Sequence, residues 1–319
     1  MTVSSDPERF PSRLRDALST VVSIRSTIPE DAFTAEVLGT ERSGYGVVIR
    51  PNGLILTIGY LTAEAETIWV TAADGQVYPG HVISYDFETG FGLVQVLQRV
   101  ELETAAMGSS DRVKIGDKVI VAGHGDSEEI VVAQVVARQE FAGYWEYWVD
   151  DALFTAPAHR HWGGAAVFNT AGEVIGIGSL LVQGSRGGDD DEGETDDINM
   201  VVPIDLLKPR LDDLVKFGRP KSDPRPWLGL YATEIADHVV VMGVASYGPA
   251  ADAGLEQGDI VLAVDGEEVA DLGDFFRRVW TLGPAGIDVP LEIGRDGETH
   301  HVTVTSADRT QFLKAPMAH

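Results

Sequence analysis

The sequence predicts a mainly β protein: a double β-barrel followed by a small five-stranded domain with two helices. Many short runs rich in β-branched residues are separated by Gly, Asn, Asp or Pro turns, and no helices alternate with them. About 180 residues follow this pattern, which is enough chain for two barrels. A proline-containing run at 219–226 then separates a last region that has its own helices and strands.

The first region is predicted to begin with an amphipathic helix over 6–20. The runs predicted as strands after it are 21–28, 36–38, 43–50, 54–57, 67–72, 77–84, 91–97, 118–122, 130–139, 144–149, 165–168, 173–178 and 198–202. The last two before 198 are joined by Asn169-Thr-Ala-Gly172, a tight turn of the type that favours a hairpin. The segment just before that hairpin, 156–164, packs Pro, two His, Arg, Trp and a Gly pair together, as a loop that positions a site would.

A helix closes the first region. Its apolar residues share one face at positions i, i+4, i+7 and i+8, and they are Leu207, Leu211, Leu214 and Val215. Pro209 is tolerated in the first turn, and Gly218 supplies the stop. The predicted organisation is therefore an N-terminal segment 1–19, a barrel domain 20–218, a linker 219–226, a second domain 227–308 and a tail 309–319.

The second domain is predicted to have strands at 239–244, 259–264, 289–293 and 301–304 and a short helix over 248–255. Asp271 is placed to cap a longer helix whose apolar residues lie on one face, with Asp274 as its reciprocal cap. Such a domain has one natural binding place, the groove between this helix and an open strand edge. An extended peptide could add there as a further strand.

Composition excludes several classes of function. Lys and Arg number 24 against 50 Asp and Glu, and the net charge of −26 makes nucleic acid and anionic membranes poor partners. With no cysteine, disulfides, thiolate metal sites and a cysteine nucleophile are excluded. The first residues lack the apolar core of a secretory signal, and no apolar run is long enough to span a membrane. The initiating Met1 and these features predict a cytoplasmic location.

Within residues 227–306, GPAADAGL, GDIVLAVDG and RDG occur in that order after WLGLYATE. These motifs resemble a PDZ domain of the kind found in HtrA-type serine proteases. The resemblance implies a binding site for peptides or unfolded protein C-termini, with the carboxylate-binding loop at 227–230. The residues it assigns to peptide binding are Trp227, Leu228, Gly229, Leu230, Tyr231, Phe275, Phe276 and Val279. Core packing is an equally good reading of the three residues at 275, 276 and 279.

The first region resembles the trypsin-like double six-stranded barrel of the same family. The matching runs are SGYGVVIRPNGLILT, LETAAMGSSDRVKIGDKVIVAG, NTAGEVIGIG and INMVVPIDLLKPRLDDLVKFGR, and they cover 20–218. The resemblance implies a bacterial protein of the protein quality control class that assembles as a homotrimer. It implies no cofactor and no metal.

The positions that carry the catalytic triad in this family hold other residues here. Tyr60 stands where the family has His, Gly90 where it has Asp, and Trp162 or Gly163 where it has the nucleophilic Ser. A phenol with a pKa near 10 is a poor base at neutral pH. The sequence thus predicts an inactive homologue, not an enzyme, whose barrel serves as a scaffold while the PDZ domain binds peptides. The alternative is an HtrA-type serine endopeptidase with a non-standard catalytic arrangement.

Three weaker readings concern polar residues. In one reading, Thr155 is a nucleophile, His159 or His161 is its base, and Asp150 or Asp151 orients the imidazole. In another, both histidines bind a metal together with Asp151. The simpler interpretation is that they are loop histidines on a reshaped former active site. The acidic run 186–197 lacks the ligand spacing of an EF-hand and is predicted to be a solvated insertion.

Overall fold

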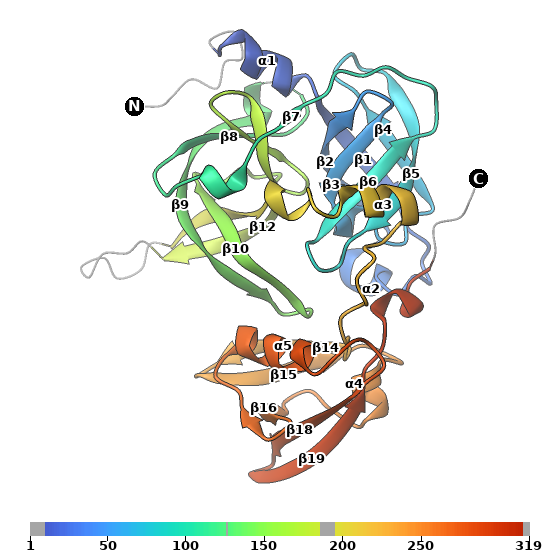
Figure 1. The fold of residues 1–319 in the computed structure, drawn as a ribbon, viewed down its shortest axis with the longest axis vertical. Helices are drawn as coiled ribbons and strands as arrows, with labels where there is room; N and C mark the ends of the chain where they lie inside the picture. The colour runs from blue at the N-terminus through green and yellow to red at the C-terminus, as the bar shows by residue number, and fades with distance from the viewer. Residues whose placement is uncertain (1–9, 126, 186–194, 315–319) are drawn as a thin grey trace. The chain divides into compact units, whose positions relative to one another are not determined.

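The computed structural model describes residues 10–125, 127–185 and 195–314 and divides the chain into two compact units (Figure 1). The first unit contains the described residues up to Gln139 together with Asp151–Pro220. The second contains Glu140–Asp150 and Lys221–Lys314. Most of the acidic run predicted as an insertion, 186–194, lies outside the described residues.

Six strands of the first unit close into a barrel in the order β1-β2-β3-β6-β5-β4. Their bounds are β1 Val21–Thr27, β2 Glu41–Arg50, β3 Leu54–Ile58, β4 Thr67–Thr71, β5 Val77–Tyr85 and β6 Phe91–Val96. Alternate residues of β1 point inward, so that Ile24 is buried while Arg25 is exposed. The barrel interior is filled by aliphatic side chains such as Ile55, Val70 and Val94.

A second sheet of the first unit has the order β11-β8-β9-β10-β13-β12-β7, and pairing of β11 with β12 closes six of its strands into a ring. The bounds are β7 Ala106–Met107, β8 Lys118–Ala122, β9 Ile130–Gly143, β10 Tyr147–Ala156, β11 Ala166–Asn169, β12 Glu173–Ser185 and β13 Thr195–Pro203. The helices and 3-10 turns are α1 Ser12–Leu18, α2 Ala35–Leu38, η2 Gly59–Leu61, η3 Ser110–Arg112, η4 Ser127–Glu129, η5 Ile204–Leu206 and α3 Leu211–Phe217. The predicted double barrel is therefore confirmed.

Two local predictions differ from the structure. Residues 36–38, predicted as a strand, belong to the short helix α2. The predicted strand 144–149 is correct only in its second half: β9 continues to Gly143, residues 144–146 form the tip of a hairpin, and β10 begins at Tyr147. The predicted stop of the closing helix is confirmed, since Gly218 follows α3 with a left-handed φ of 72°.

The second unit is built on a sheet of order β14-β15-β16-β18-β19, with β17 paired to β16. The bounds are β14 Leu230–Ile235, β15 His238–Val244, α4 Pro249–Asp252, β16 Ile260–Val264, β17 Glu267–Glu268, α5 Leu272–Thr281, β18 Asp288–Arg295, β19 Glu298–Thr305 and η6 Arg309–Phe312. The Asp271 carboxylate accepts from the Asp274 N–H, and Asp274 accepts from the Ala270 N–H. The predicted reciprocal cap of α5 is thus present.

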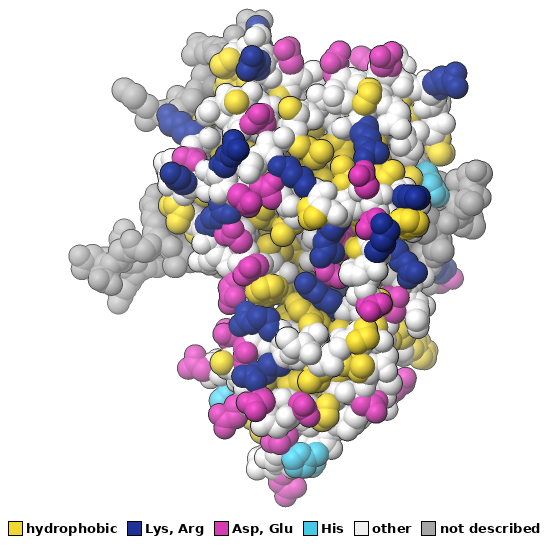
Figure 2. Space-filling view, in the orientation of Figure 1, with side chains coloured by type: hydrophobic (Ala, Val, Ile, Leu, Met, Phe, Trp, Pro, Cys, Tyr) yellow, Lys and Arg dark blue, Asp and Glu magenta, His cyan; other side chains and the backbone are white. Residues whose placement is uncertain are grey.

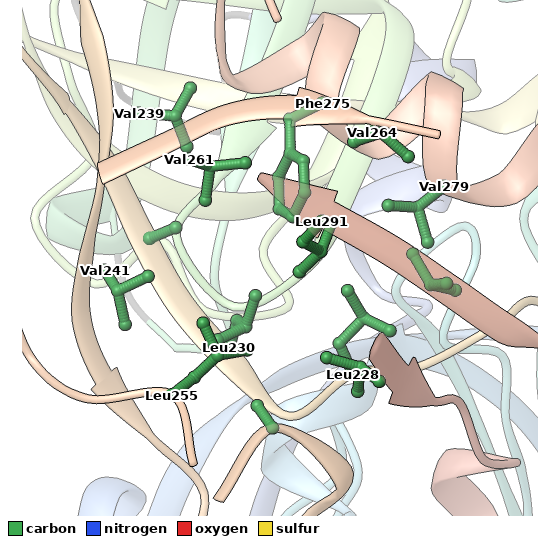
Figure 3. Close-up of a cluster of buried hydrophobic side chains, with 14 of the residues drawn as sticks. Leu228, Leu230, Val239, Val241, Leu255, Val261, Val264, Phe275, Val279 and Leu291 are labelled. Carbon is green, nitrogen blue, oxygen red and sulfur yellow. The ribbon is translucent and has the colours of Figure 1, made fainter. Parts of the chain in front are cut away.

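One cluster of apolar side chains holds the second unit together (Figure 3). Phe275 and Val279 of α5 point into it from one side, and Leu291 of β18 lies beneath the Phe275 ring. Leu228 and Leu230, at the start of β14, contribute to the same cluster. The polypeptide around 228–230 is consequently fixed by its own side chains.

The surface carries both signs of charge. Acidic and basic side chains are interspersed over the face drawn in Figure 2. None of the helices in the described part of the chain is long and apolar enough to cross a membrane.

Candidate functional site

Three consecutive backbone N–H groups of the second unit converge on one carboxylate. The N–H groups of Leu228, Gly229 and Leu230 donate to the Glu146 carboxylate over 2.9, 2.7 and 2.9 Å. Gly229 has a left-handed φ of 78°, a conformation that glycine adopts without steric cost. Successive N–H groups aimed at one point form an anion-binding concavity, and the Glu146 carboxylate occupies it; the role of this loop in peptide binding remains a prediction.

The other residues predicted for peptide binding occupy different places. Trp227 exchanges two backbone hydrogen bonds of 3.0 Å with Ala307, which holds the loop at its start. Tyr231 lies on β14, with its ring centroid 6.2 Å from that of Tyr144. Trp227 therefore lies at the start of the carboxylate loop, and Tyr231 lies directly after it beside the hairpin.

Phe275, Phe276 and Val279 pack in the hydrophobic core. Each is at most 2% exposed. The Phe275 and Phe276 rings are 5.5 Å apart, and Phe276 stacks on Trp280. Their contacts are those of core residues. Core packing was one of the two interpretations that the sequence left open for them, and peptide binding was the other.

The Glu146 carboxylate is delivered by the hairpin between β9 and β10. The Tyr144 carbonyl accepts from the Ala232 N–H of β14 at 2.9 Å, which adds the hairpin tip to the end strand of the sheet. On the α5 side, Glu140 accepts from Arg277 at 2.9 Å, and Trp148 packs against the core of the second unit. The hairpin thus lies between β14 and α5, the position predicted for a peptide.

Burial raises the pKa of Glu146, since the side chain has little access to water. The three N–H donors and the charge of Arg309 act in the opposite direction by favouring the ionised form. Arg309 also donates to the Trp145 carbonyl at 3.2 Å. The loop and Arg309 together supply the positive potential that a carboxylate needs once it has left water.

In the first unit, the three positions predicted as former triad positions come together. Tyr60 lies in η2 directly after β3, and the N–H of the preceding Gly59 donates to the Gly90 carbonyl at 2.7 Å. A Cβ added to Gly163 would lie 2.6 Å from the Tyr60 hydroxyl oxygen. The Tyr60 hydroxyl donates to the Ser179 carbonyl at 3.2 Å, and burial raises its pKa above the usual value, with a hydrogen bond to Trp162 opposing. Their role as triad positions remains a prediction.

The Gly pair in the neighbouring loop allows a close approach of backbone to backbone. Gly164 has a φ of 78°, and a Cβ there would be 1.9 Å from the Tyr45 carbonyl oxygen. The Gly164 N–H donates to the Gly178 carbonyl, and the Ala165 N–H donates to the Trp162 carbonyl. These two N–H groups are therefore used within the fold.

A cluster of titratable side chains includes residues of the loop that contains this Gly pair. Its members are Glu129, His159, His161 and Tyr45. The Glu129 carboxylate accepts from the Tyr45 hydroxyl at 2.7 Å, lies 3.3 Å from Nδ1 of His161 and 3.7 Å from Nε2 of His159. Burial alone would raise the pKa of Glu129, but the hydrogen bonds from Tyr45 and His161 outweigh it and leave the pKa below its usual value. The arrangement joins a carboxylate to an imidazole, the pair that orients a general base.

His159 is the buried member of this cluster. Its Nδ1 accepts from the His161 N–H at 3.1 Å, which leaves Nε2 to carry the proton and donate to the Glu129 carbonyl at 3.1 Å. Burial lowers the pKa of His159 and favours this neutral form. His161, by contrast, is 67% exposed and is the imidazole that solvent or a substrate can reach.

The other polar combinations predicted from the sequence are not assembled. Asp151 is held by Arg138 through three of its hydrogen bonds, so it accompanies neither histidine. Thr155 is buried. Among residues 10–125, 127–185 and 195–314, no three His, Cys, Asp or Glu side chains are grouped as a metal site.

Sequence reasoning missed the two carboxylates that organise these sites. Glu129 comes near the histidines because β8 pairs with β11, with Ala122 opposite Ala166, so the loop after one and the loop before the other leave the sheet together. For Glu146 a local signal existed: five of the eleven residues from Glu140 to Asp150 are aromatic, far more than a solvated hairpin tip needs.

Comparison with known families agrees with the two kinds of domain. Residues 44–177 match the model of the trypsin-like peptidase domain. Residues 226–305 match the model of the PDZ domain.

Curated relatives match most of the chain. A probable periplasmic serine endoprotease DegP-like of Chlamydia pneumoniae is 27% identical over 280 residues, which are 82% of this chain and 54% of that protein. A protein with the same description in Pseudomonas savastanoi pv. phaseolicola is 26% identical over 318 residues, 94% of this chain and 63% of that protein. The chain thus spans little more than half the length of these relatives.

Solved structures show the same fold. The serine endoprotease from Yersinia pestis is 23% identical with a TM-score of 0.55, covering 97% of this chain and 99% of that one. The HtrA-type protease AlgW with tripeptide is 21% identical with a TM-score of 0.53, covering 96% of this chain and 99% of that one.

These comparisons contradict two predictions made from the sequence. The prediction that the chain is not an enzyme is wrong, because its curated relatives are named serine endoproteases. The prediction of a cytoplasmic location is wrong in the same way, because those relatives are named periplasmic. The chain thus combines a match to the trypsin-like peptidase domain with a match to the PDZ domain, and it is similar over most of its length to serine endoproteases described as DegP-like.

Proposed function

We propose that the second unit binds extended peptides that present a carboxylate, including the free C-termini of unfolded proteins. The observation that carries this proposal is the convergence of the Leu228, Gly229 and Leu230 N–H groups on one carboxylate. Three such donors, fixed by the burial of Leu228 and Leu230 in the core, are a preorganised site for a carboxylate of any origin.

The neighbouring strand supports the same proposal. β14 is the end strand of its sheet, and its Ala232 N–H donates to the Tyr144 carbonyl of the hairpin tip. A ligand added at this edge gains main-chain hydrogen bonds without regard to its sequence, while the carboxylate loop sets its register. The HtrA-type protease AlgW, which has the same fold, was solved with a tripeptide, and this supports a peptide as the ligand class.

Fluorescence polarisation with labelled C-terminal peptides tests the proposal. Each peptide is compared with its C-terminally amidated form, which has the same side chains but no terminal charge. We expect at least one peptide to bind roughly tenfold more tightly than its amide, because the amide leaves buried donors poorly matched. Equal affinity of both forms for every peptide would contradict the assignment of the loop.

We also propose that the first unit hydrolyses peptides as a serine endopeptidase with a non-standard arrangement. The names of the relatives support this activity, and the contact between the Glu129 carboxylate and Nδ1 of His161 supplies an oriented imidazole. With Nδ1 so held, Nε2 of His161 is the atom that would take the proton of a nucleophile. The hydroxyl that attacks is left to experiment.

Incubation with unfolded casein and with a fluorophosphonate probe tests this activity. Cleavage and covalent labelling are expected in the wild type, and mass spectrometry of the labelled peptide identifies the nucleophile. His161→Gln should reduce the rate by about 100-fold or more, the usual share of a general base. His301→Gln is the control, because His301 is 78% exposed and lies in the other unit. Neither cleavage nor labelling in the wild type would contradict the proposal.

Two further properties are proposed from the family. A periplasmic location follows from the names of the relatives and is tested by cell fractionation. A homotrimer follows from the family resemblance and is tested by light scattering of the purified chain, where a monomer mass would contradict it.

A further inference from the structure

The peptide groove of the second unit already contains a segment of the chain itself. The segment is the hairpin tip 144–146, which follows β9 and precedes β10. Its Tyr144 carbonyl pairs with the Ala232 N–H of β14, and its Glu146 carboxylate fills the loop of three N–H groups. These are the two kinds of contact that define strand addition and carboxylate recognition in one site.

We infer that the hairpin tip is an internal ligand of the groove, and that an external peptide binds only by displacing it. This inference rests on the proposed peptide binding and adds its regulation and its ligand class. A displacing peptide must offer the same groups: a backbone carbonyl for the Ala232 N–H, a carboxylate, and an aromatic side chain two residues before it, in the place of Tyr144.

The hairpin tip makes this contact although its turn has an unfavourable backbone conformation. Glu146 has a left-handed φ of 59°, where glycine or asparagine is the favoured residue of a three-residue hairpin loop. Its side chain is 8% exposed, an unusual position for the charged residue of a hairpin tip. Both features are explained by the three N–H groups that receive the carboxylate.

Aromatic side chains pack on one another within the hairpin, and two of them, Tyr144 and Trp148, also lie against Tyr231 of β14 and the core of the second unit, respectively. Tyr144 packs edge-on against Trp145, with ring centroids 4.9 Å apart, and Trp145 stacks on Tyr147 at 5.4 Å. Trp148 lies against the core of the second unit, with the Arg277 guanidinium 5.5 Å from its ring centroid. A short free peptide has fewer contacts than this, and displacement therefore requires a high local concentration or a second interaction.

Hydrogen exchange of the full chain tests the occupancy without any added peptide. The amides of Leu228, Gly229, Leu230 and Ala232 are compared in the wild type, Glu146→Gln and Glu146→Ala. We expect these four amides to exchange at least tenfold faster in both variants, while core amides of β18 keep their protection, which verifies that the second unit is folded. Glu268→Gln is the matched control, an exposed glutamate of the same unit. Equal exchange in the wild type and both variants would overturn the inference.

Peptide affinity then separates the inference from the function on which it rests. The probe is a fluorescein-labelled peptide with the sequence of residues 140–146 and a free C-terminus. We expect Glu146→Ala to bind it at least tenfold more tightly than the wild type, and replacement of the peptide's Tyr by Ala to reverse the gain. If the amides exchange faster in the variants but the labelled peptide binds neither the wild type nor Glu146→Ala, the internal contact is supported and peptide binding is refuted. Equal affinity for wild type and variant would refute displacement.

Discussion

Gly164 combines a left-handed backbone with a backbone contact that leaves no room for a side chain. Its φ is 78°, and an added Cβ would lie 1.9 Å from the Tyr45 carbonyl oxygen. Gly75 has almost the same φ of 79° but has nothing within 4 Å of an added Cβ. The two glycines therefore separate the conformational cost of an alanine from its steric cost.

We predict that Gly164→Ala lowers the free energy of unfolding by roughly 3 kcal/mol, since overpacking adds to the cost of a left-handed alanine. Gly75→Ala should lower it by only about 1 kcal/mol. Urea denaturation followed by circular dichroism measures both. Equal losses in the two variants would show that the approach to Tyr45 is relieved without cost.

Asp259 provides a pH-dependent contribution to stability. Burial alone would raise the pKa of this carboxyl, but hydrogen bonds of 2.6 Å from Arg295 and one from the Glu256 N–H outweigh it and lower the pKa below 3.8. A lowered pKa in the folded state means that the contribution is complete above the unfolded pKa and is lost as the pH falls through the folded one.

The difference in unfolding free energy between wild type and Asp259→Asn should accordingly be constant from pH about 7 down to about 5 and shrink below pH about 4. Urea midpoints at a series of pH values measure it. A difference that does not change down to pH about 2 would assign the effect of the substitution to packing alone.

At the scale of secondary structure, α5 is the element that the sequence describes most fully. Its cap and its apolar face are both local patterns, and Asp271 and Asp274 form the reciprocal cap that their spacing predicts. The three residues 36–38 show the opposite case. They are too few to display a period, and a single turn of helix, α2, occupies a position that β-branched and apolar composition assigns to a strand.

We expect Asp271→Ala to destabilise the second unit by about 1 kcal/mol, because the Asp274 N–H loses its acceptor at the helix start. Asp271→Ser keeps a side-chain oxygen in the same place and should recover most of the loss. Hydrogen exchange of the first turn of α5 measures the effect. If the serine and alanine variants show the same increase in exchange, the effect does not arise from helix capping.

At the scale of the whole chain, the contacts that make the candidate sites are long-range. Glu146 meets Leu228 across 82 residues, and Tyr45 meets Glu129 across 84. The resemblance to PDZ domains implied a carboxylate loop at 227–230, because the motifs that carry the resemblance are local in the sequence. It could not predict the carboxylate, because nothing in the residues near Glu146 specifies a partner so far along the chain. The same reason explains why His159 and His161 were identified without Glu129.

The net charge of −26 also acts at this scale, since it repels any acidic ligand. Binding of the acidic peptide with the sequence of 140–146 should strengthen several-fold when NaCl rises from about 20 to about 300 mM, as the Debye length falls well below 10 Å. A peptide of the same length with lysine in place of its glutamates should show the opposite trend. Fluorescence polarisation measures both, and weaker binding of the acidic peptide in salt would mean that the local field of the loop dominates.

The left-handed conformation of Glu146 has a consequence for how the chain can change. Glycine or asparagine at this position would relax the turn and leave the three N–H groups without an acceptor. Glutamate keeps the acceptor and accepts an unfavourable turn. A random library at position 146 sorted for hairpin order should therefore enrich glycine, whereas one sorted for resistance to a competing peptide should retain glutamate. Position 146 would then report which of the two properties selection has favoured.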